Sequence, residues 1–173
     1  MTDDAVKIVS EIDKCWEKLT IANDFVFCKT MLNVDLCRDV LEAILGVPID
    51  HVEHISRQEQ IDASPDAKGI RLDVYVRDEE GTVYNVEMQA TDTFELPQRS
   101  RYYHALMALD QLGKGRPYKD LKNSYVIFIC GFDPFDLGRR VYCFENRCQG
   151  AERLTLGDGT KTLLLSTTAP KQE

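Results

Sequence analysis

The 173-residue chain lacks several features that mark particular classes of protein. It has no run of ~18 apolar residues of the kind that spans a membrane. Its first residues, MTDDAVKIVS, are acidic and lack the apolar stretch of a signal peptide. It also has no internal repeat, no low-complexity segment and no glycine-rich phosphate loop. We therefore predict a cytoplasmic protein with no membrane contact.

Paired cysteines and an excess of positive charge are missing too. The six cysteines form no CxxC pair and several lie within apolar runs, so buried reduced thiols are expected rather than disulfides or a zinc site. The formal net charge of -8 weighs against a nucleic-acid partner, because such proteins usually neutralise phosphates with lysine and arginine. A local basic surface remains open, and its candidates are Arg99 with Arg101, Lys114 with Arg116 and Lys119, and Arg139 with Arg140.

The length fits a single domain over residues 1–173, large enough to bury a core. The patterns predict, in chain order, a helix over 5–20, a helix capped by Asn23 or Asp24, a helix over 36–45 capped by Asp35, a strand over 49–55, a loop over 57–68, a β-hairpin over 71–89, a helix from Pro97 to about Leu112, a buried strand over 125–130, a strand over 140–145 and a hairpin of 154–156 with 162–165. This order indicates an α/β fold with a mixed β-sheet flanked by helices.

The hairpin over residues 71–89 carries acids on an apolar background. Two alternating runs rich in valine and tyrosine flank the turn Asp78–Gly81. A register symmetric about this turn places Asp73 directly across from Glu87, with the two side chains side by side. Glu87 and Gln89 share a face because strand residues alternate. The hairpin therefore predicts an aspartate, a glutamate and an amide on one face of the sheet.

Two adjacent carboxylates either share a proton or hold a cation between them. Mg²⁺ fits such a pair, since it binds through one or two carboxylates plus waters and can activate a water for attack on phosphorus. Gln89 would point at that water. A solvated strand face is the competing interpretation of Asp73 and Glu87, and a register slip of one residue would separate them.

Several segments in order resemble a known family. Asp73, followed fourteen residues later by Glu87-Met88-Gln89, resembles the D…(D/E)xK core of the PD-(D/E)XK nuclease superfamily, with glutamine in place of lysine. The segments Asn23-Asp24-Phe25, RSRYYHALMALDQL and YKDLKNSYVIFI are similar to its recombination-promoting nuclease, or transposase-like, branch. The resemblance covers about residues 20–146.

The resemblance implies a restriction-endonuclease-like fold and a DNA endonuclease that depends on Mg²⁺ or Mn²⁺ and hydrolyses phosphodiester bonds in recombination or transposition. It implies Asp73 and Glu87 as metal ligands, Gln89 as a third catalytic residue and Asp24 as an additional acid, for which a plain helix cap is the alternative. The Pro65-Asp66 dipeptide also matches the superfamily name, but Asp66 lies in a predicted loop and we prefer Asp73.

The helix that begins near Pro97 supplies the predicted DNA contacts. Arg99 and Arg101 lie near its start, where they would emerge beside the hairpin, and a helix N-terminus attracts phosphate. Tyr103 is predicted to pack in the core, and His104 to be structural rather than a proton relay.

Two other functions stay open. A nuclease fold that no longer cuts and serves as a binding or assembly module agrees with the acidic charge. Relatives continue with helical sequence beyond this length, so we expect a truncated copy or an isolated nuclease domain, and homodimerisation stays open with it. A phosphodiesterase that acts on RNA would use the same chemistry.

Overall fold

The computed structural model describes residues 24–62 and 68–168. The helix expected over 5–20, the Pro65-Asp66 dipeptide and the side chain of Asp24 lie outside this description. The helices are α2 (Asp24–Met31), α3 (Val34–Leu45), α4 (Leu96–Gln111) and the short 3-10 helix η1 (Tyr118–Asp120). The strands are β1 (Val52–Ile61), β2 (Ile70–Asp78), β3 (Val83–Gln89), β4 (Ser124–Cys130), β5 (Val141–Phe144), β6 (Arg147–Cys148), β7 (Ala151–Thr155) and β8 (Thr160–Ser166).

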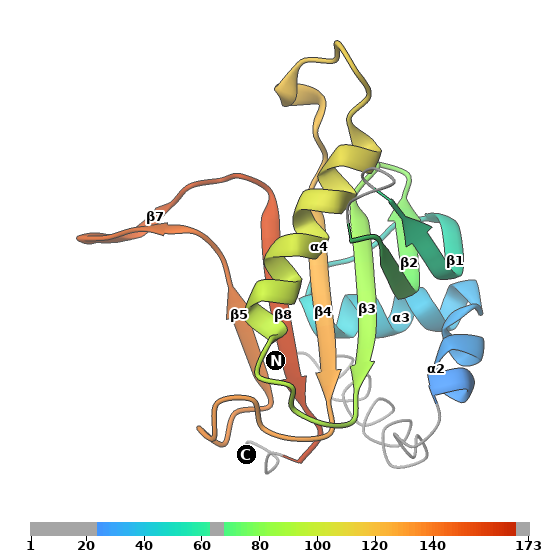
Figure 1. Ribbon diagram of the computed structural model, residues 1–173, viewed down its shortest axis with the longest axis vertical. Coiled ribbons are helices and arrows are strands. Elements are labelled where there is room, and N and C mark those ends of the chain that lie inside the picture. Colours follow the sequence, from blue (N-terminus) through green and yellow to red (C-terminus); the bar gives the residue numbers. More distant parts are fainter. Residues whose placement is uncertain (1–23, 63–67, 169–173) are drawn as a thin grey trace.

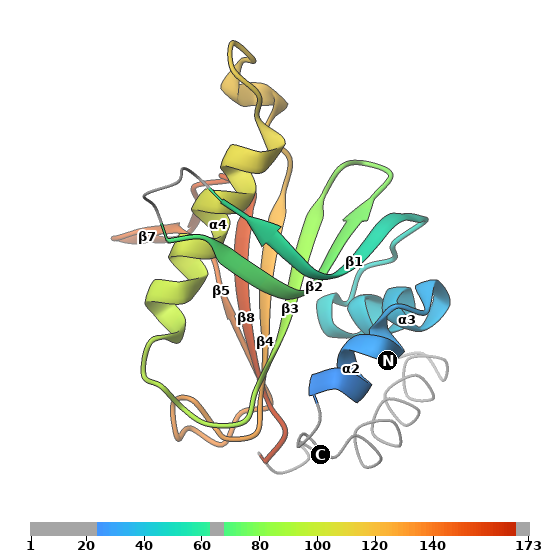
Figure 2. The same cartoon turned by 45° about the vertical axis from the view of Figure 1, so that its right-hand side comes forward.

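Six strands form one mixed sheet in the order β1-β2-β3-β4-β8-β5. The central strands β3, β4 and β8 are parallel, and β1, β2 and β5 pair antiparallel with their neighbours. Helix α4 covers one face, while α2 and α3 lie on the other (Figures 1 and 2). This confirms the predicted α/β fold, a mixed sheet flanked by helices that is consistent with a restriction-endonuclease-like domain.

The central strand β4 separates two hydrophobic cores. Val126 and Phe128 pack with α4, whereas Ile127 and Ile129 pack with α2 and α3. Their side chains are almost completely buried, as the continuous apolar run of this segment predicted. None of the helices in the described ranges 24–62 and 68–168 is long and apolar enough to cross a membrane.

The predicted cap of α3 is wrong by two residues. The side chain of Asn33, not that of Asp35, accepts a hydrogen bond from the Leu36 backbone N–H at 3.1 Å. Either residue type is a good N-cap, so composition alone did not distinguish them. Gly46 ends the helix with a φ of 69°, because glycine tolerates this left-handed conformation.

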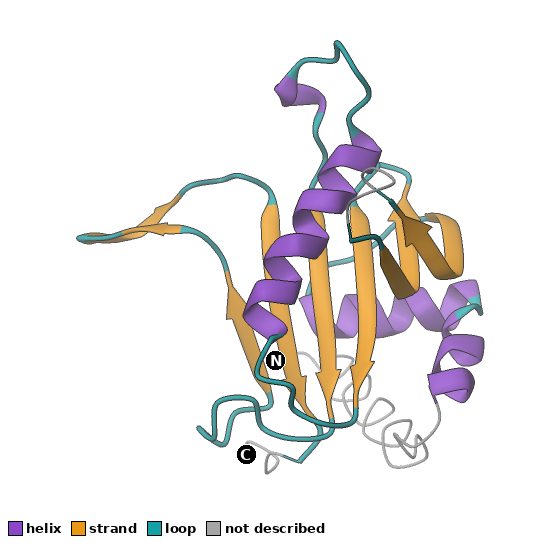
Figure 3. Ribbon diagram, in the orientation of Figure 1, coloured by secondary structure: helices purple, strands orange, loops and turns teal. Residues whose placement is uncertain are grey.

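Two strand predictions are wrong because the pairing partners lie far away in the sequence or at an edge. The segment 57–61, predicted as loop, belongs to β1. This strand lies at the edge of the sheet, and its mostly polar, solvent-facing residues do not show the alternation of apolar and polar residues that marks a strand. The segment 162–165 does not pair with 154–156: it belongs to β8, which lies between β4 and β5. Strand β7 instead pairs with β6 in a ribbon that projects from the sheet (Figure 3).

Candidate active site

The hairpin of β2 and β3 has the predicted register. Val74 pairs with Val86 and Arg77 pairs with Val83, so the same register places Asp73 opposite Glu87. The regular β2–β3 pairing ends at Val74 and Val86. The candidate acids therefore lie just beyond the point where the two strands stop sharing a backbone ladder.

The two carboxylates replace the backbone bonds that are lost there. The Asp73 backbone N–H donates to Glu87 Oε1 at 3.2 Å, and the Met88 backbone N–H donates to Asp73 Oδ2 at 3.4 Å. Each acid thus accepts a hydrogen bond from the strand that carries the other. This exchange brings the two carboxylates side by side, as the sequence predicted.

Glu87 is buried, with 3% of its surface exposed. Its Oε1 also accepts a bond from Asn85 Nδ2 at 3.2 Å, and its Oε2 forms an ion pair with Arg99 Nη2 at 3.0 Å. Burial, followed by the negative charge of Asp73, raises the pKa of Glu87 to about 7, although Arg99 and the hydrogen bonds oppose the rise. Burial and the neighbouring carboxylate of Asp73 together make Glu87 hold its proton more tightly than an exposed glutamate does.

Arg99 reaches the site from the second turn of α4. Its Nη1 donates to Gln89 Oε1 at 2.6 Å, and its Nε and Nη2 donate to the Tyr103 hydroxyl at 3.3 and 2.9 Å. Its guanidinium carbon also lies 5.3 Å from the centre of the Phe128 ring, a cation–π distance. With the bond to Glu87, four of its five N–H groups have partners among the described residues. Arg99 is therefore fixed between the sheet and α4, with one N–H left over.

Gln89 has the predicted place on the face of Glu87. Besides its bond to Arg99, its Nε2 donates to the Met88 carbonyl oxygen at 2.8 Å. Gln89 thus stands where the family pattern has a lysine, and its amide oxygen binds the guanidinium of Arg99.

Arg101 and Glu42 lie outside this cluster, whereas the side chain of Asp24 is not among the described ones. Arg101 is exposed and lies roughly 200° round the helix from Arg99, so it faces away from the acids. Asp24 begins α2. Glu42, an acid of α3, accepts a bond from the Ile49 backbone N–H at 2.7 Å and so stabilises the turn after this helix.

His104 is structural, as predicted. Its ring nitrogens lie 2.7 Å from Ser124 Oγ and 3.2 Å from Thr162 Oγ1, which connects α4 to β4 and β8. Burial lowers the pKa of His104 to about 4, so the ring is neutral at physiological pH.

Two residues of the site were not predicted in their roles. Asn85 is fully buried beside Glu87, and its Oδ1 has no hydrogen-bond partner among the described residues. Its position two residues before Glu87 on the same strand was the available signal. Tyr103 was expected mainly to pack, and it also accepts bonds from Arg99, one helical turn away.

The donor set fits a hard divalent cation. Mg²⁺ binds through one or two carboxylates, with waters and substrate phosphate completing its shell. Asp73 and Glu87 supply these carboxylates, and the pKa of Glu87 is raised first by burial and second by the charge of Asp73, a repulsion that a bound cation would offset. The described part of the chain has no group of three or more acidic, histidine or cysteine side chains that could hold a metal, so the fit rests on the two acids.

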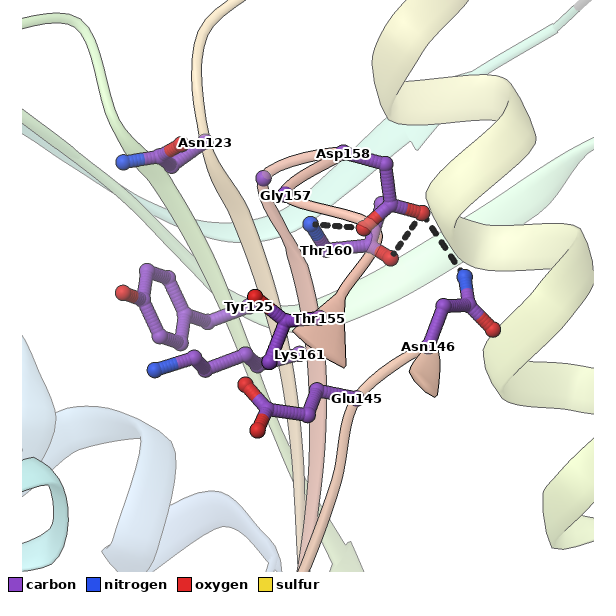
Figure 4. A pocket seen from close by; sticks show the side chains of 10 residues that line it. Asn123, Tyr125, Glu145, Asn146, Thr155, Gly157, Asp158, Thr160 and Lys161 are labelled. Atoms are coloured by element: carbon purple, nitrogen blue, oxygen red, sulfur yellow. Dashed lines mark hydrogen bonds between the residues drawn. The ribbon is translucent and has the colours of Figure 1, made fainter. Parts of the chain in front are cut away.

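A pocket of about 310 Å³ lies elsewhere, at the start of β4 and β8 (Figure 4). Asp158 rims it and accepts bonds from Asn146 Nδ2 and from the hydroxyl of Thr160. The parallel strands end at the candidate acids and begin at this pocket, so the two lie at opposite ends of the sheet.

Comparison with known proteins identifies a family. The family described as PD-(D/E)XK nuclease family transposase matches residues 21–149, a range that includes all of the candidate site. Searches of curated proteins and of solved structures found no match.

Proposed function

Because the chain belongs to the PD-(D/E)XK nuclease family transposases, we propose that it is a metal-dependent endonuclease that hydrolyses phosphodiester bonds of DNA in recombination or transposition. One observation supports this proposal most: the paired carboxylates of Asp73 and Glu87, held by exchanged backbone bonds where β2 and β3 separate. A purely structural hairpin gains nothing from a buried glutamate with a raised pKa beside a second acid.

Asp73 and Glu87 would hold Mg²⁺ or Mn²⁺. When bound, such an ion polarises the phosphate and lowers the pKa of the attacking water. Gln89 would orient the water through the second N–H of its Nε2, since the first donates to the Met88 carbonyl oxygen. A neutral amide cannot supply the charge of a lysine, so Arg99 would stabilise the negative charge that develops on the phosphate, through its remaining N–H.

Three further assignments belong to the proposal. Arg101, exposed near the start of α4, would contact a phosphate outside the site. Asp24, at the start of α2, would add a third acid. The protein would act in the cytoplasm, as a monomer or a homodimer.

Nicking of supercoiled plasmid tests the reaction. We expect relaxed product with Mg²⁺ or Mn²⁺, none with EDTA, and none from Asp73→Asn or Glu87→Gln. Asp50→Asn is the matched control, because Asp50 is an exposed aspartate outside the site and should cut like the wild type. Equal product from wild type and Asp73→Asn would show a contaminating nuclease and refute the assignment.

Thermal unfolding tests metal binding without activity. At 100 times its dissociation constant, Mn²⁺ adds ~2.7 kcal/mol of stability, on the order of 5–10 °C for a chain of this size. We expect this shift in the wild type and Asp50→Asn but not in Asp73→Asn.

The ion pair between Arg99 and Glu87 supports a second candidate, a nuclease fold that no longer cuts and binds a partner. In that case the arginine compensates Glu87 permanently. The wild type would then show neither nicking nor a shift with Mn²⁺, whereas Arg99→Met, which removes the cationic partner of Glu87, would gain the shift.

A further inference from the structure

Phe94 is an exposed aromatic residue in the loop that carries the chain from the candidate acids to Arg99. It lies five residues after Gln89 and five before Arg99, and 84% of its surface is exposed. The loop runs from the end of β3 to the start of α4, at the end of the central strands where the candidate site lies (Figures 1 and 2). The loop thus joins the strand that carries Glu87 to the helix that carries Arg99.

The backbone of Phe94 is unfavourable for its side chain. Its φ is +58°, in the left-handed region where a bulky residue is a genuine outlier. The Phe94 backbone N–H donates to Asp92 Oδ1 at 2.7 Å, which fixes the turn. Glycine or asparagine would adopt this conformation with less strain, and the exposed ring gains no core contact in return. Strain at an exposed position is characteristic of functional sites.

The flat apolar ring of Phe94 fits a nucleobase better than a protein surface. Its neighbours in the chain, Thr93 and Glu95, are exposed and polar, so Phe94 is the one large apolar side chain that this loop exposes. A protein interface requires an extended apolar core, whereas a nucleobase offers a single flat face of similar size. Base–aromatic stacking is also independent of sequence and of charge, which suits a chain of net charge -8.

We propose that the ring of Phe94 stacks on an unstacked base of the substrate strand next to the cleaved phosphate. The inference rests on the proposed function and deepens it: the preferred substrate is DNA whose bases are already splayed, as in single strands, flaps or distorted duplexes. Stacking holds the strand at the loop, while Arg99 and the acids engage the phosphate.

Binding of fluorescent oligonucleotides tests the stacking. Anisotropy is measured with Mg²⁺ in a Glu87→Gln background, which is expected not to cut, for a single strand and for a duplex of the same sequence. Phe94→Ala should weaken single-strand binding by about 5-fold to 100-fold, the range that loss of one base–aromatic stack produces. Phe94→Trp should retain the affinity, and its fluorescence should be quenched by DNA beyond the change seen for Trp16, the one natural tryptophan.

Tyr118 provides the matched control. It is an aromatic residue with 88% of its surface exposed, in η1 at the opposite end of the sheet (Figure 1). Tyr118→Ala should bind like the parent protein. Phe94→Asn distinguishes the effect of the ring from that of the backbone conformation, because asparagine tolerates positive φ. This variant should lose affinity like Phe94→Ala but should unfold at or above the temperature of the parent protein.

Three outcomes would overturn the inference. Equal affinity of the parent and Phe94→Ala would show that the ring contacts no base. A loss of affinity that follows the loss of a dimer in analytical ultracentrifugation would assign Phe94 to an interface between two copies. If the wild type also fails to bind and nick DNA, the proposed function fails together with the stacking inference. If the wild type nicks DNA and Phe94→Ala binds it equally well, only the stacking inference is refuted.

Discussion

Replacing Arg99 by methionine tests whether the ion pair with Glu87 contributes to stability. The acceptor Glu87 is 3% exposed and the Arg99 side chain 27% exposed, with 3.0 Å between Oε2 and Nη2. Methionine keeps an unbranched apolar stem against Phe128 but removes the charge. Loss of one partner from a fully buried pair costs 3–5 kcal/mol, and partial exposure of the arginine reduces this to about 2 kcal/mol here.

The cost of Arg99→Met should depend on pH. The pKa of Glu87 is about 7 in the folded protein, above its ordinary value of 4.5, so wild-type stability from this group falls as pH rises from about 4.5 to 7. Arg99 lowers the pKa of Glu87, so its removal raises that pKa and extends the fall to higher pH. At pH 5 Glu87 is protonated in both folded proteins, and the missing guanidinium costs little. The penalty should therefore be largest near pH 8 and small near pH 5.

Urea unfolding with EDTA at pH 8 and pH 5 measures this difference. The variants are Arg99→Met, Glu87→Gln and the double variant, so that a double-mutant cycle isolates the pair. At pH 8 we expect Arg99→Met to cost clearly less in the Glu87→Gln background than alone. The same cost at both pH values, or in both backgrounds, would refute the role assigned to the ion pair.

Three further substitutions test the fold around the site. The pKa of His104 is lowered from 6.5 to about 4, so stability should fall by about 3 kcal/mol as pH drops from 6.5 to 4; His104→Gln should lose most of this slope in denaturant titrations. Gly159→Ala should cost about 1–2 kcal/mol, because the residue has a φ of +74° and a Cβ there would lie 2.6 Å from Asn123 Oδ1; the urea midpoint measures it. Asn33→Ala should cost about 1 kcal/mol of unfolding free energy through loss of the α3 cap, while Asp35→Ala should not.

The core of the candidate site was predictable because its geometry is local. A short turn fixes the register of β2 and β3, and the register alone places Asp73 opposite Glu87. The start of α4 at Leu96, with Pro97 in its first turn, was equally visible. Together these signals predicted Arg99 and Arg101 beside the acids, and in the structure only Arg99 contacts Glu87.

What the sequence did not reveal depends on contacts between distant segments. Strand β8 forms because its apolar residues are buried beside β4, and nothing within 160–166 distinguishes that partner from the nearby β7. The polar segment 57–61 becomes a strand only because β2 offers an open edge. The hydrogen bonds of Arg99 required the same kind of information, since two residues separated by one helical turn share a face without necessarily touching.

The replacement of lysine by Gln89 changes how the site obtains its positive charge. A lysine on β3 would carry that charge on the same rigid strand as Glu87. Here the charge comes from Arg99 on α4, and its position depends on the Tyr103 hydroxyl and the Phe128 ring. The charge is therefore present in the site only when α4 is packed on the sheet. The loop that bears Phe94 leads directly into this helix. A substrate strand that contacts the loop would therefore act on the same helix that positions Arg99.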